Sequence, residues 1–356
     1  AAWDRLAGDD PFVSHAFLAA LEESGSVGPG TGWTPAPITI ANETGAVSAA
    51  APAYLKSHSQ GEYVFDHGWA DAFERAGGRY YPKLQVAVPF TPVPGPRLLG
   101  AWPQQLLAAA EAVTLQNELS SAHVTFIEEA GAAECERRGW LIRHGIQYHW
   151  LNRGYRDFDD FLGQLTSRKR KAIRKERAAA RAGLEFAALT GSAIGPAEWD
   201  AMWAFYQDTG SRKWGRPYLT RAFFDRIGET MGDRVLLLLA YRGGRPIAGA
   251  LNFLGPDTLY GRYWGTIDEV PFLHFELCYY QAIEWAISNG LSSVQAGAQG
   301  EHKLPRGYEP VISRSAHFIA DPGFRRAVEA FVEEERRAIA DEAEWERAAL
   351  PYRSSA

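Results

Sequence analysis

The residues most capable of chemistry lie close together in the segment 273–310, LHFELCYYQAIEWAISNGLSSVQAGAQGEHKLPRGYEP. Its acid–base candidates are His274, Glu276, Glu301, His302 and Lys303. An imidazole or carboxylate that takes the proton of an attacking amine accelerates transfer ~10²–10⁴-fold. Free N–H groups at a helix start, or in the glycine-containing loop 297–300, would hold the negative charge that develops on a carbonyl oxygen. The same spacing also fits a carboxylate that caps its helix and a histidine on a surface loop, so both interpretations stay open.

Other kinds of catalytic site are disfavoured by the motifs. Four residues after His274 and Glu276 stand Cys278 and Tyr280, so the two-histidine helix pattern of zinc enzymes is absent. The sequence contains no GxSxG, no P-loop and no GxGxxG motif. Cys278 lies among apolar neighbours and is expected to be an inert core thiol. We therefore predict no metal and no tightly bound cofactor.

A strongly basic run, TSRKRKAIRKERAAAR, occupies residues 166–181 and holds eight Lys/Arg and one Glu. Like charges on one helix repel, which favours an anionic partner. Arg168, Lys169 and Lys171 are the candidate contacts for a phosphate-bearing donor or for an anionic membrane surface. No aromatic residue interleaves the run, which disfavours base stacking. The alternative is an exposed helix paired with acids such as Asp157, Asp159 and Asp160.

Two aromatic segments could line a substrate channel. Residues 205–224, FYQDTGSRKWGRPYLTRAFF, contain the candidates Arg212, Lys213, Trp214 and Tyr218. The strand-like segment 258–266 contains Arg262 and Tyr263. Successive side chains of a strand point to opposite faces, so one set could line a pocket while the other packs inward. Core packing is the competing interpretation for both segments.

The elements that must position these residues follow one order twice. Each half is expected to contain a helix, two or three antiparallel strands, a helix and a strand. In the first half these are 11–24, 34–57, 83–89, 103–119 and 123–128, and in the second 197–231, 235–266, 272–289 and 292–298. The pattern predicts an α+β fold made of two similar domains, 1–145 and 146–356. The second domain would include the basic helix and a C-terminal helix from about 322 to 348.

The composition of the chain limits the classes of protein to which it can belong. The chain has 356 residues, 46% hydrophobic and 22% charged, with two cysteines and a net charge of −6. A negative chain is not expected to coat DNA. The few cysteines and the lack of a long apolar run favour the cytoplasm. The basic run adds the expectation of peripheral contact with the inner face of the inner membrane.

Four stretches resemble the bacterial Fem-like acyltransferases, a family associated with peptidoglycan biosynthesis/recognition. They are RKWGRPYLTRAFF, GALNFLGPDTLYGRYWG, LHFELCYYQAIEWAI and VQAGAQGEHKLPRGY, and the resemblance runs from about Trp3 to Arg347. It implies a tandem of two GNAT-like domains, each a mixed, mostly antiparallel sheet flanked by helices. GNAT-type enzymes move an acyl group from a thioester to an amine, whereas the Fem branch takes an aminoacyl group from tRNA.

The resemblance also gives weight to particular positions. They are Arg212, Lys213, Trp214, Tyr218, Arg262, Tyr263, His274, Glu276, Gln299, Glu301, His302 and Lys303. We expect His302 or Glu276 to be the base and Arg262 or the backbone of 297–300 to stabilise the oxyanion. Lys303 and the basic helix would steer the donor. Gln295 stands where the family pattern has Glu, and no RxxGxG/A pyrophosphate loop follows the strand 258–266.

The sequence therefore predicts an N-acyltransferase. Its expected co-substrate is acyl-CoA or acyl carrier protein, and its expected acceptor is the primary amine of a long-chain lipid base, as in bacterial ceramide (sphingolipid) formation. One alternative is transfer from aminoacyl-tRNA to a peptidoglycan precursor. Another is a non-catalytic protein that binds an acyl or peptidoglycan ligand.

Overall fold

The computed structural model describes residues 2–214, 217–297 and 300–353, without the side chains of 211–214 and of Glu301. The chain divides into two compact units. Unit 1 is Ala1–Ile146 with Ile312–Ala343, and unit 2 is Gln147–Val311 with Glu344–Ala356. The sequence analysis assigned everything after 145 to the second domain. That assignment is wrong for Ile312–Ala343, because the strand in this segment pairs with a strand of unit 1.

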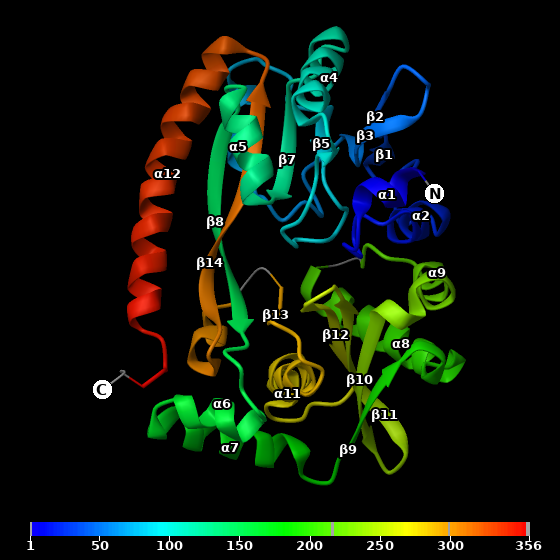
Figure 1. The fold of residues 1–356 in the computed structure, drawn as a ribbon, viewed down its shortest axis with the longest axis vertical. Coiled ribbons are helices and arrows are strands. Elements are labelled where there is room, and N and C mark those ends of the chain that lie inside the picture. Colours follow the sequence, from blue (N-terminus) through cyan, green and yellow to red (C-terminus); the bar gives the residue numbers. More distant parts are fainter. Residues whose placement is uncertain (1, 215–216, 298–299, 354–356) are drawn as a thin grey trace. The chain divides into compact units, whose positions relative to one another are not determined.

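Unit 1 is an α+β layer structure (Figure 1). Its helices are α1 (Ala2–Ala7), α2 (His15–Glu23), α3 (His67–Arg75), α4 (Pro103–Gln116), α5 (Glu129–Arg137) and most of α12 (Pro322–Ala348). Its strands are β1 (Trp33–Pro35), β2 (Ile38–Ala41), β3 (Val47–Ala51), β4 (Ala53–Lys56), β5 (Lys83–Val86), β6 (Leu99–Gly100), β7 (Ser121–Ile127) and parts of β8 (Leu141–Leu151) and β14 (Glu309–Ile319). The order in its main sheet is β1-β4-β5-β7-β14-β8, and β2-β3-β6 form a small second sheet.

The two faces of this main sheet differ in polarity. Alternate residues of β5, β7 and β14, among them Leu84, Val124 and Ala316, join a buried apolar cluster with Leu106 and Leu107 of α4. Pro103 begins α4, where a missing N–H costs nothing. The residues between them, such as Lys83 and His123, are polar and also buried. One sheet face of unit 1 is thus a conventional core, and the other is a buried polar surface.

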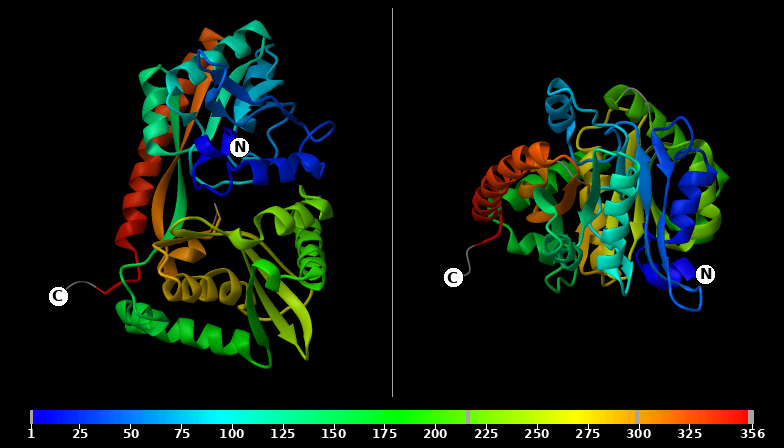
Figure 2. Two further views of the ribbon diagram at one scale, coloured as in Figure 1. Left: turned by 45° about the vertical axis from the view of Figure 1, so that its right-hand side comes forward. Right: turned by 90° about the horizontal axis from the view of Figure 1, so that it is seen from above.

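Unit 2 has the helices α6 (Phe158–Gln164), α7 (Ser167–Arg181), α8 (Pro196–Trp214), α9 (Arg221–Met231), α10 (Leu273–Phe275) and α11 (Gln281–Ser288). Short turns are η1 (Gly191–Ala193), η2 (Gly232–Arg234), the π-helical η3 (Glu276–Tyr280) and η4 (Glu301–Arg306). Its strands are β9 (Glu185–Thr190), β10 (Val235–Arg242), β11 (Arg245–Leu254), β12 (Thr258–Thr266) and β13 (Ser293–Gln295), in the order β8-β13-β12-β11-β10-β9. Figure 2 gives two further views of these elements.

Helix α8 packs closely on β11 and β12. A Cβ atom at Gly265 of β12 would collide with the carbonyl group of Phe205 in α8, so only glycine permits this approach. The strand's next residue inward, Trp264, instead contacts His274 on the other side. β12 therefore separates an aromatic core under α8 from the segment that carries the candidate site.

Both units contain one parallel strand pair joined by a helical crossover. β5 pairs with β7 across α4, and β12 pairs with β13 across α10, η3 and α11. The other strand pairs described in the two units are antiparallel. The predicted α+β class, with two similarly ordered mixed sheets flanked by helices, is confirmed. Helix α3 and the strands β9 and β14 are additions that the sequence analysis did not predict.

Candidate functional site

A group of rings from four elements, β12, α10, η3 and η4, forms the centre of the site in unit 2. We call Trp264, His274, Phe275, Tyr279 and His302 the histidine cluster. The Tyr279 hydroxyl lies 2.8 Å from Nε2 of His302, and the two groups form a hydrogen bond whose direction depends on the His302 tautomer. The His274 ring centroid is 6.1 Å from that of His302 and 5.2 Å from that of Trp264. The structure therefore brings together the two histidines that the sequence analysis selected.

Local backbone features place these side chains. The helical segment starts after Phe272, whose φ of 63° sets the turn into α10. It continues as the π-helical turn η3, a form often found at functional sites, and this turn presents Tyr279 to His302. On the other side, a Cβ at Gly300 would overlap the His302 ring. Glycine at 300 is thus required for the ring to fold back against Tyr279.

Lys303 is an ammonium-bearing side chain in an apolar position. It is 1% exposed, and its Nζ donates to the Gly297 carbonyl oxygen at 2.6 Å and lies 5.7 Å from the Tyr148 ring centroid. In the described part of the chain it has no acidic partner. Burial lowers the pKa of Lys303 to about 7. Near pH 7 a large share of the molecules therefore carries Lys303 as a neutral amine, which can accept a proton.

His149 of β8 belongs to the same site, although the sequence analysis missed it. Burial and the nearby charge of Lys303 lower the pKa of His149 to about 4, so the imidazole is neutral. Its Nε2 is buried and has no hydrogen-bond partner among the described residues. The strand pairing that aligns His149 with Gln295 joins positions far apart in sequence, which no local pattern indicated.

Glu276 does not lie free in the site. Its carboxylate is fully buried and receives two bonds of 3.0 Å from the Arg177 guanidinium, with Arg181 at 3.4 Å. Arg177 also bonds Glu284 at 2.7 Å. This geometry favours a structural role, in which Glu276 anchors the basic helix to η3, over the predicted role of base.

The substitution Glu276→Gln separates these two roles. We expect it to lower the free energy of unfolding by about 2–4 kcal/mol, because Arg177 would keep only the half-exposed Glu284 as partner. The turnover of the folded fraction should stay within about threefold of the unmodified protein. Urea unfolding and activity per folded molecule measure both. A hundredfold loss of turnover with unchanged stability would restore Glu276 as the base.

The basic helix α7 divides its charges between two tasks. Arg177 and Arg181 turn inward to Glu276, and Arg174 pairs with Asp159. Arg168, Lys169, Arg170, Lys171 and Lys175 make no ion pair within the described chain and lie at the surface, Lys169 and Arg170 half-buried. Part of the run is therefore neutralised, as one hypothesis required, and its first half remains a positive surface.

The remaining candidates are distributed around β12. Arg262 is the extra residue of a β-bulge opposite β11, a feature that is common beside active sites. Tyr263 packs on Tyr206 of α8 at 5.5 Å, which matches the core interpretation. Tyr218 is half-buried after α8. Arg212, Lys213 and Trp214 lie at the end of α8, but their side chains, like Gln299 and the side chain of Glu301, are outside the described part.

The loop 90–100 of unit 1 is rich in proline and lies between β5 and α4. Its one arginine, Arg97, is 1% exposed and donates to the carbonyl oxygens of Val93, Pro96 and Thr125. The guanidinium holds the loop together and does not face solvent. Within the described residues no group of three His, Cys, Asp or Glu side chains is placed to hold a metal ion. Nor is any helix found there that is long and apolar enough to cross a bilayer.

The fold and this site define a two-unit α+β protein with an amine-containing polar centre. The family described as FemAB-like, peptidoglycan biosynthesis/recognition, matches residues 1–354. The chain therefore belongs to the FemAB-like family, as the sequence resemblance predicted. No curated protein matches the chain at a significant level.

Several solved structures share the fold. FemX is 12% identical over 92% of this chain and 97% of its own, with a TM-score of 0.54. The C-terminal domain of a putative lysylphosphatidylglycerol synthetase from Agrobacterium fabrum is 12% identical over 94% and 95%, with a TM-score of 0.53. L-PGS from Bacillus licheniformis is 12% identical over 91% and 97%, with a TM-score of 0.52. At this identity the similarity establishes the fold alone.

Proposed function

We propose that the protein is a transferase that moves an acyl group, in the form of an aminoacyl ester of tRNA, to an amine of a peptidoglycan precursor. The observation that carries the proposal is the match of nearly the whole chain to a family described by peptidoglycan biosynthesis and recognition. The long-chain lipid base that ranked first in the sequence hypothesis has no such support. It is replaced here by the alternative acceptor.

The chemistry of the site supports amine attack on a carbonyl. The acceptor nitrogen forms a bond to the carbonyl carbon and loses a proton to the neutral amine of Lys303. The carbon–oxygen bond to the tRNA ribose then breaks, and the ribose oxygen takes up the proton that Lys303 received, which restores the neutral amine of Lys303. His302 and Tyr279, which share a hydrogen bond, are placed to relay that proton. The bulged Arg262 is our candidate for the developing oxyanion.

The nature of the acyl donor is inferred from the positive charge on the surface of α7. The unpaired half of α7, Arg168 to Lys171 with Lys175, offers positive charge at the start of a helix. Both tRNA and an acyl-CoA thioester are polyanions, so this surface supports an anionic donor of either kind. The family description favours the first, and the experiment below separates the two.

The test is a transfer assay that crosses two donors with two acceptors. A mixture of radiolabelled aminoacyl-tRNAs and radiolabelled palmitoyl-CoA are each offered a UDP-linked muramoyl pentapeptide and sphinganine. We expect label only in the pentapeptide, and only from tRNA. Label in sphinganine from palmitoyl-CoA would overturn the proposal in favour of lipid acylation. Arg245→Gln, at the exposed first residue of β11, is the matched control and should leave the rates unchanged.

A further inference from the structure

The polar face of the unit 1 sheet contains residue types that a covered sheet face rarely holds. Alternate positions on three adjacent strands are Lys83 and Gln85 of β5, Ser121, His123 and Thr125 of β7, and Ser315 and His317 of β14. All seven are buried. Apolar side chains would be the ordinary choice there, because buried polar groups cost free energy unless each is satisfied.

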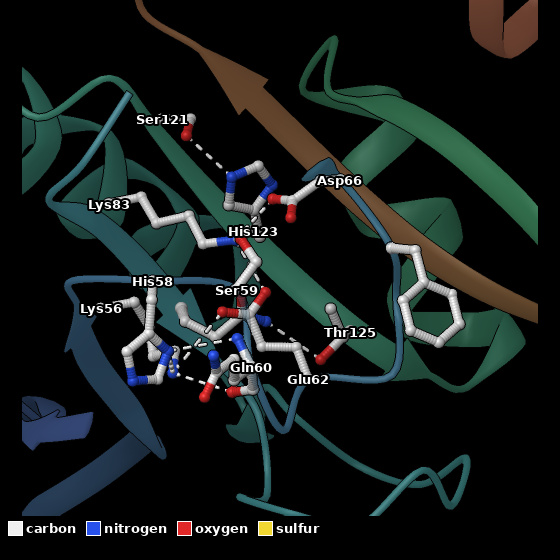
Figure 3. A network of polar contacts seen from close by, with 12 residues as sticks. Lys56, His58, Ser59, Gln60, Glu62, Asp66, Lys83, Ser121, His123 and Thr125 are labelled. Atoms are coloured by element: carbon white, nitrogen blue, oxygen red, sulfur yellow. Dashed lines mark hydrogen bonds and ion pairs between the residues drawn. The ribbon is translucent and has the colours of Figure 1, made fainter. Parts of the chain in front are cut away.

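One segment covers the β5 side of this face and is bound by two lysines (Figure 3), whereas Trp69 of α3 packs on His317. We call residues 57–66, between β4 and α3, the strap. Lys83 Nζ donates to three strap groups: the Ser59 hydroxyl at 2.9 Å, Glu62 Oε2 at 2.7 Å and Asp66 Oδ2. Lys56 Nζ donates to the Gln60 carbonyl oxygen at 3.1 Å and lies 3.8 Å from Glu62 Oε1. The charges of two lysines and two carboxylates therefore balance beneath the strap.

Three acceptor atoms in this cluster receive no hydrogen bond within the described part of the chain, and one of them, Glu62 Oε1, has only the ion-pair contact with Lys56 at 3.8 Å. Glu62 Oε1, Asp66 Oδ1 and Gln85 Oε1 are buried and receive no hydrogen bond from the described residues. Their residues are 4%, 2% and 0% exposed. An unsatisfied buried acceptor typically costs about 1–3 kcal/mol, so three in one cluster require a reason.

Backbone strain gathers around the same cluster. Tyr63 in the strap, Phe90 after β5 and Phe126 in β7 have φ values of 58°, 57° and 52°. Phe90 N–H donates to the strap's Gly61 carbonyl oxygen at 3.2 Å, and Phe126 is the extra residue of a bulge opposite β14. Non-glycine residues in this region of φ store about 1–3 kcal/mol each and concentrate at ligand sites. The strain is a second, independent sign of a functional surface.

The chemistry of the leftover atoms selects the ligand class. All three are acceptors, so their complement carries several N–H or O–H donors, and the buried Trp33 Nε1 beside the strap is a donor that would take an acceptor from the same ligand. The carboxylates of Glu62 and Asp66 would repel an anion. The cluster also stabilises ammonium groups on aromatic rings, since Lys56 Nζ lies 3.7 Å from the Trp33 ring centroid and Lys83 Nζ lies 5.5 Å from that of Tyr80.

We propose that the polar face beneath the strap is a binding site for the protonated primary amine of a small ligand, held by Glu62 Oε1, Asp66 Oδ1 and Gln85 Oε1. The strap must move to admit the ligand, and its outer residues Gln60 and Phe65 are exposed. Lifting the strap would break the contacts of both lysines, the bond that Tyr80 donates to Asp66, and the bond that Arg143 donates to the Phe65 carbonyl oxygen.

The experiment measures binding in the absence of any acyl donor. Ethanolamine, ethylene glycol and N-acetylethanolamine differ in one group and are titrated by ligand-observed NMR into the full chain. We expect saturable binding of ethanolamine alone. Gln85→Met removes one acceptor and leaves every charge in place, and it should weaken binding about tenfold or more. Glu62→Gln should do the same, and circular dichroism establishes that each variant is folded.

The matched control is Gln104→Met in α4, which removes a half-buried amide whose partner is Glu134. It should leave ethanolamine binding unchanged. Equal binding of ethylene glycol, an absence of ethanolamine binding, or unchanged affinity in both site variants would each overturn the inference. Because no donor is present, ethanolamine binding together with a failed transfer assay leaves this inference standing and removes the proposed function. Transfer to the pentapeptide without ethanolamine binding does the reverse.

Discussion

Replacing Lys83 with methionine is expected to lower the free energy of unfolding by about 3–5 kcal/mol, because removal of one partner from a buried ion pair leaves the other uncompensated. Lys83 is fully buried and bonds both Glu62 and Asp66. Methionine fills a similar volume, so a cavity contributes little. The loss is comparable to the whole stability of many domains. Urea unfolding followed by tryptophan fluorescence measures it.

Two further variants identify the cause. Arg174→Met breaks the exposed pair with Asp159, whose side chains are 56% and 75% exposed, and should cost less than about 1 kcal/mol. Glu62→Gln in the Lys83→Met background removes one of the carboxylates left without a cation, and it should restore part of the loss. A Lys83→Met protein as stable as the Arg174→Met protein would mean that Lys83 is not charged in the folded state.

The repeated order of elements was accessible from the sequence because it depends on local patterns. Pro103 at a helix start, the alternating strand 258–266 and the glycine after 289 each have local meaning, and α4, β12 and α11 follow them. Strand β14 was missed for the opposite reason. Its buried positions include Ser315 and His317, so its alternation does not appear as apolar against polar. The same polar face that hides the strand also contains the proposed amine site.

The site could be predicted only as far as residues close in sequence determine it. His274 and Tyr279 share one helical segment, and a single glycine loop brings His302 back to them. The ion pair that occupies Glu276 comes from Arg177, 99 residues earlier, and no spacing rule reveals it. His149 likewise reaches Lys303 through strand pairing. Partners far away in sequence decide which polar residue can take part in a reaction and which one stabilises the fold.

Lys83 and Lys303 show most clearly how the surrounding groups determine the role of a buried polar residue. Both are lysines with nearly complete burial, at 0% and 1% exposure. Carboxylates surround Lys83, and they raise its pKa above the usual value against the effect of burial. Lys303 has a carbonyl oxygen and a ring as neighbours, and burial lowers its pKa to about 7. The first lysine is a charged structural group, and the second is a neutral amine held at some cost to stability.

Replacing Lys303 with methionine should therefore act oppositely to Lys83→Met: it should reduce turnover without reducing stability. We expect turnover to fall about 10²–10⁴-fold, because the proton acceptor is lost. At pH 7 the free energy of unfolding should not fall and should rise by about 1 kcal/mol or more, since a buried amine that has no acidic partner among the described residues is removed. The transfer assay and urea unfolding test the two effects together. A large loss of stability would show that Lys303 is a structural group like Lys83.

The pH dependence of turnover and of stability gives a second test of Lys303, because the direction of each change can be predicted. The neutral form of Lys303 is active, so turnover should rise about tenfold per pH unit up to pH 7 and level off above it. The folded pKa lies below the unfolded value, so between pH 7 and about 10.5 the unfolded chain binds more protons. Stability should then rise with pH by up to about 1.4 kcal/mol per unit in that window, and the rise should vanish in Lys303→Met. Lys303→Arg is the matched control, because its charge is fixed and it should be inactive at every pH. A Lys303→Arg protein that retained the pH profile of the unmodified enzyme would assign the titrating base to another residue.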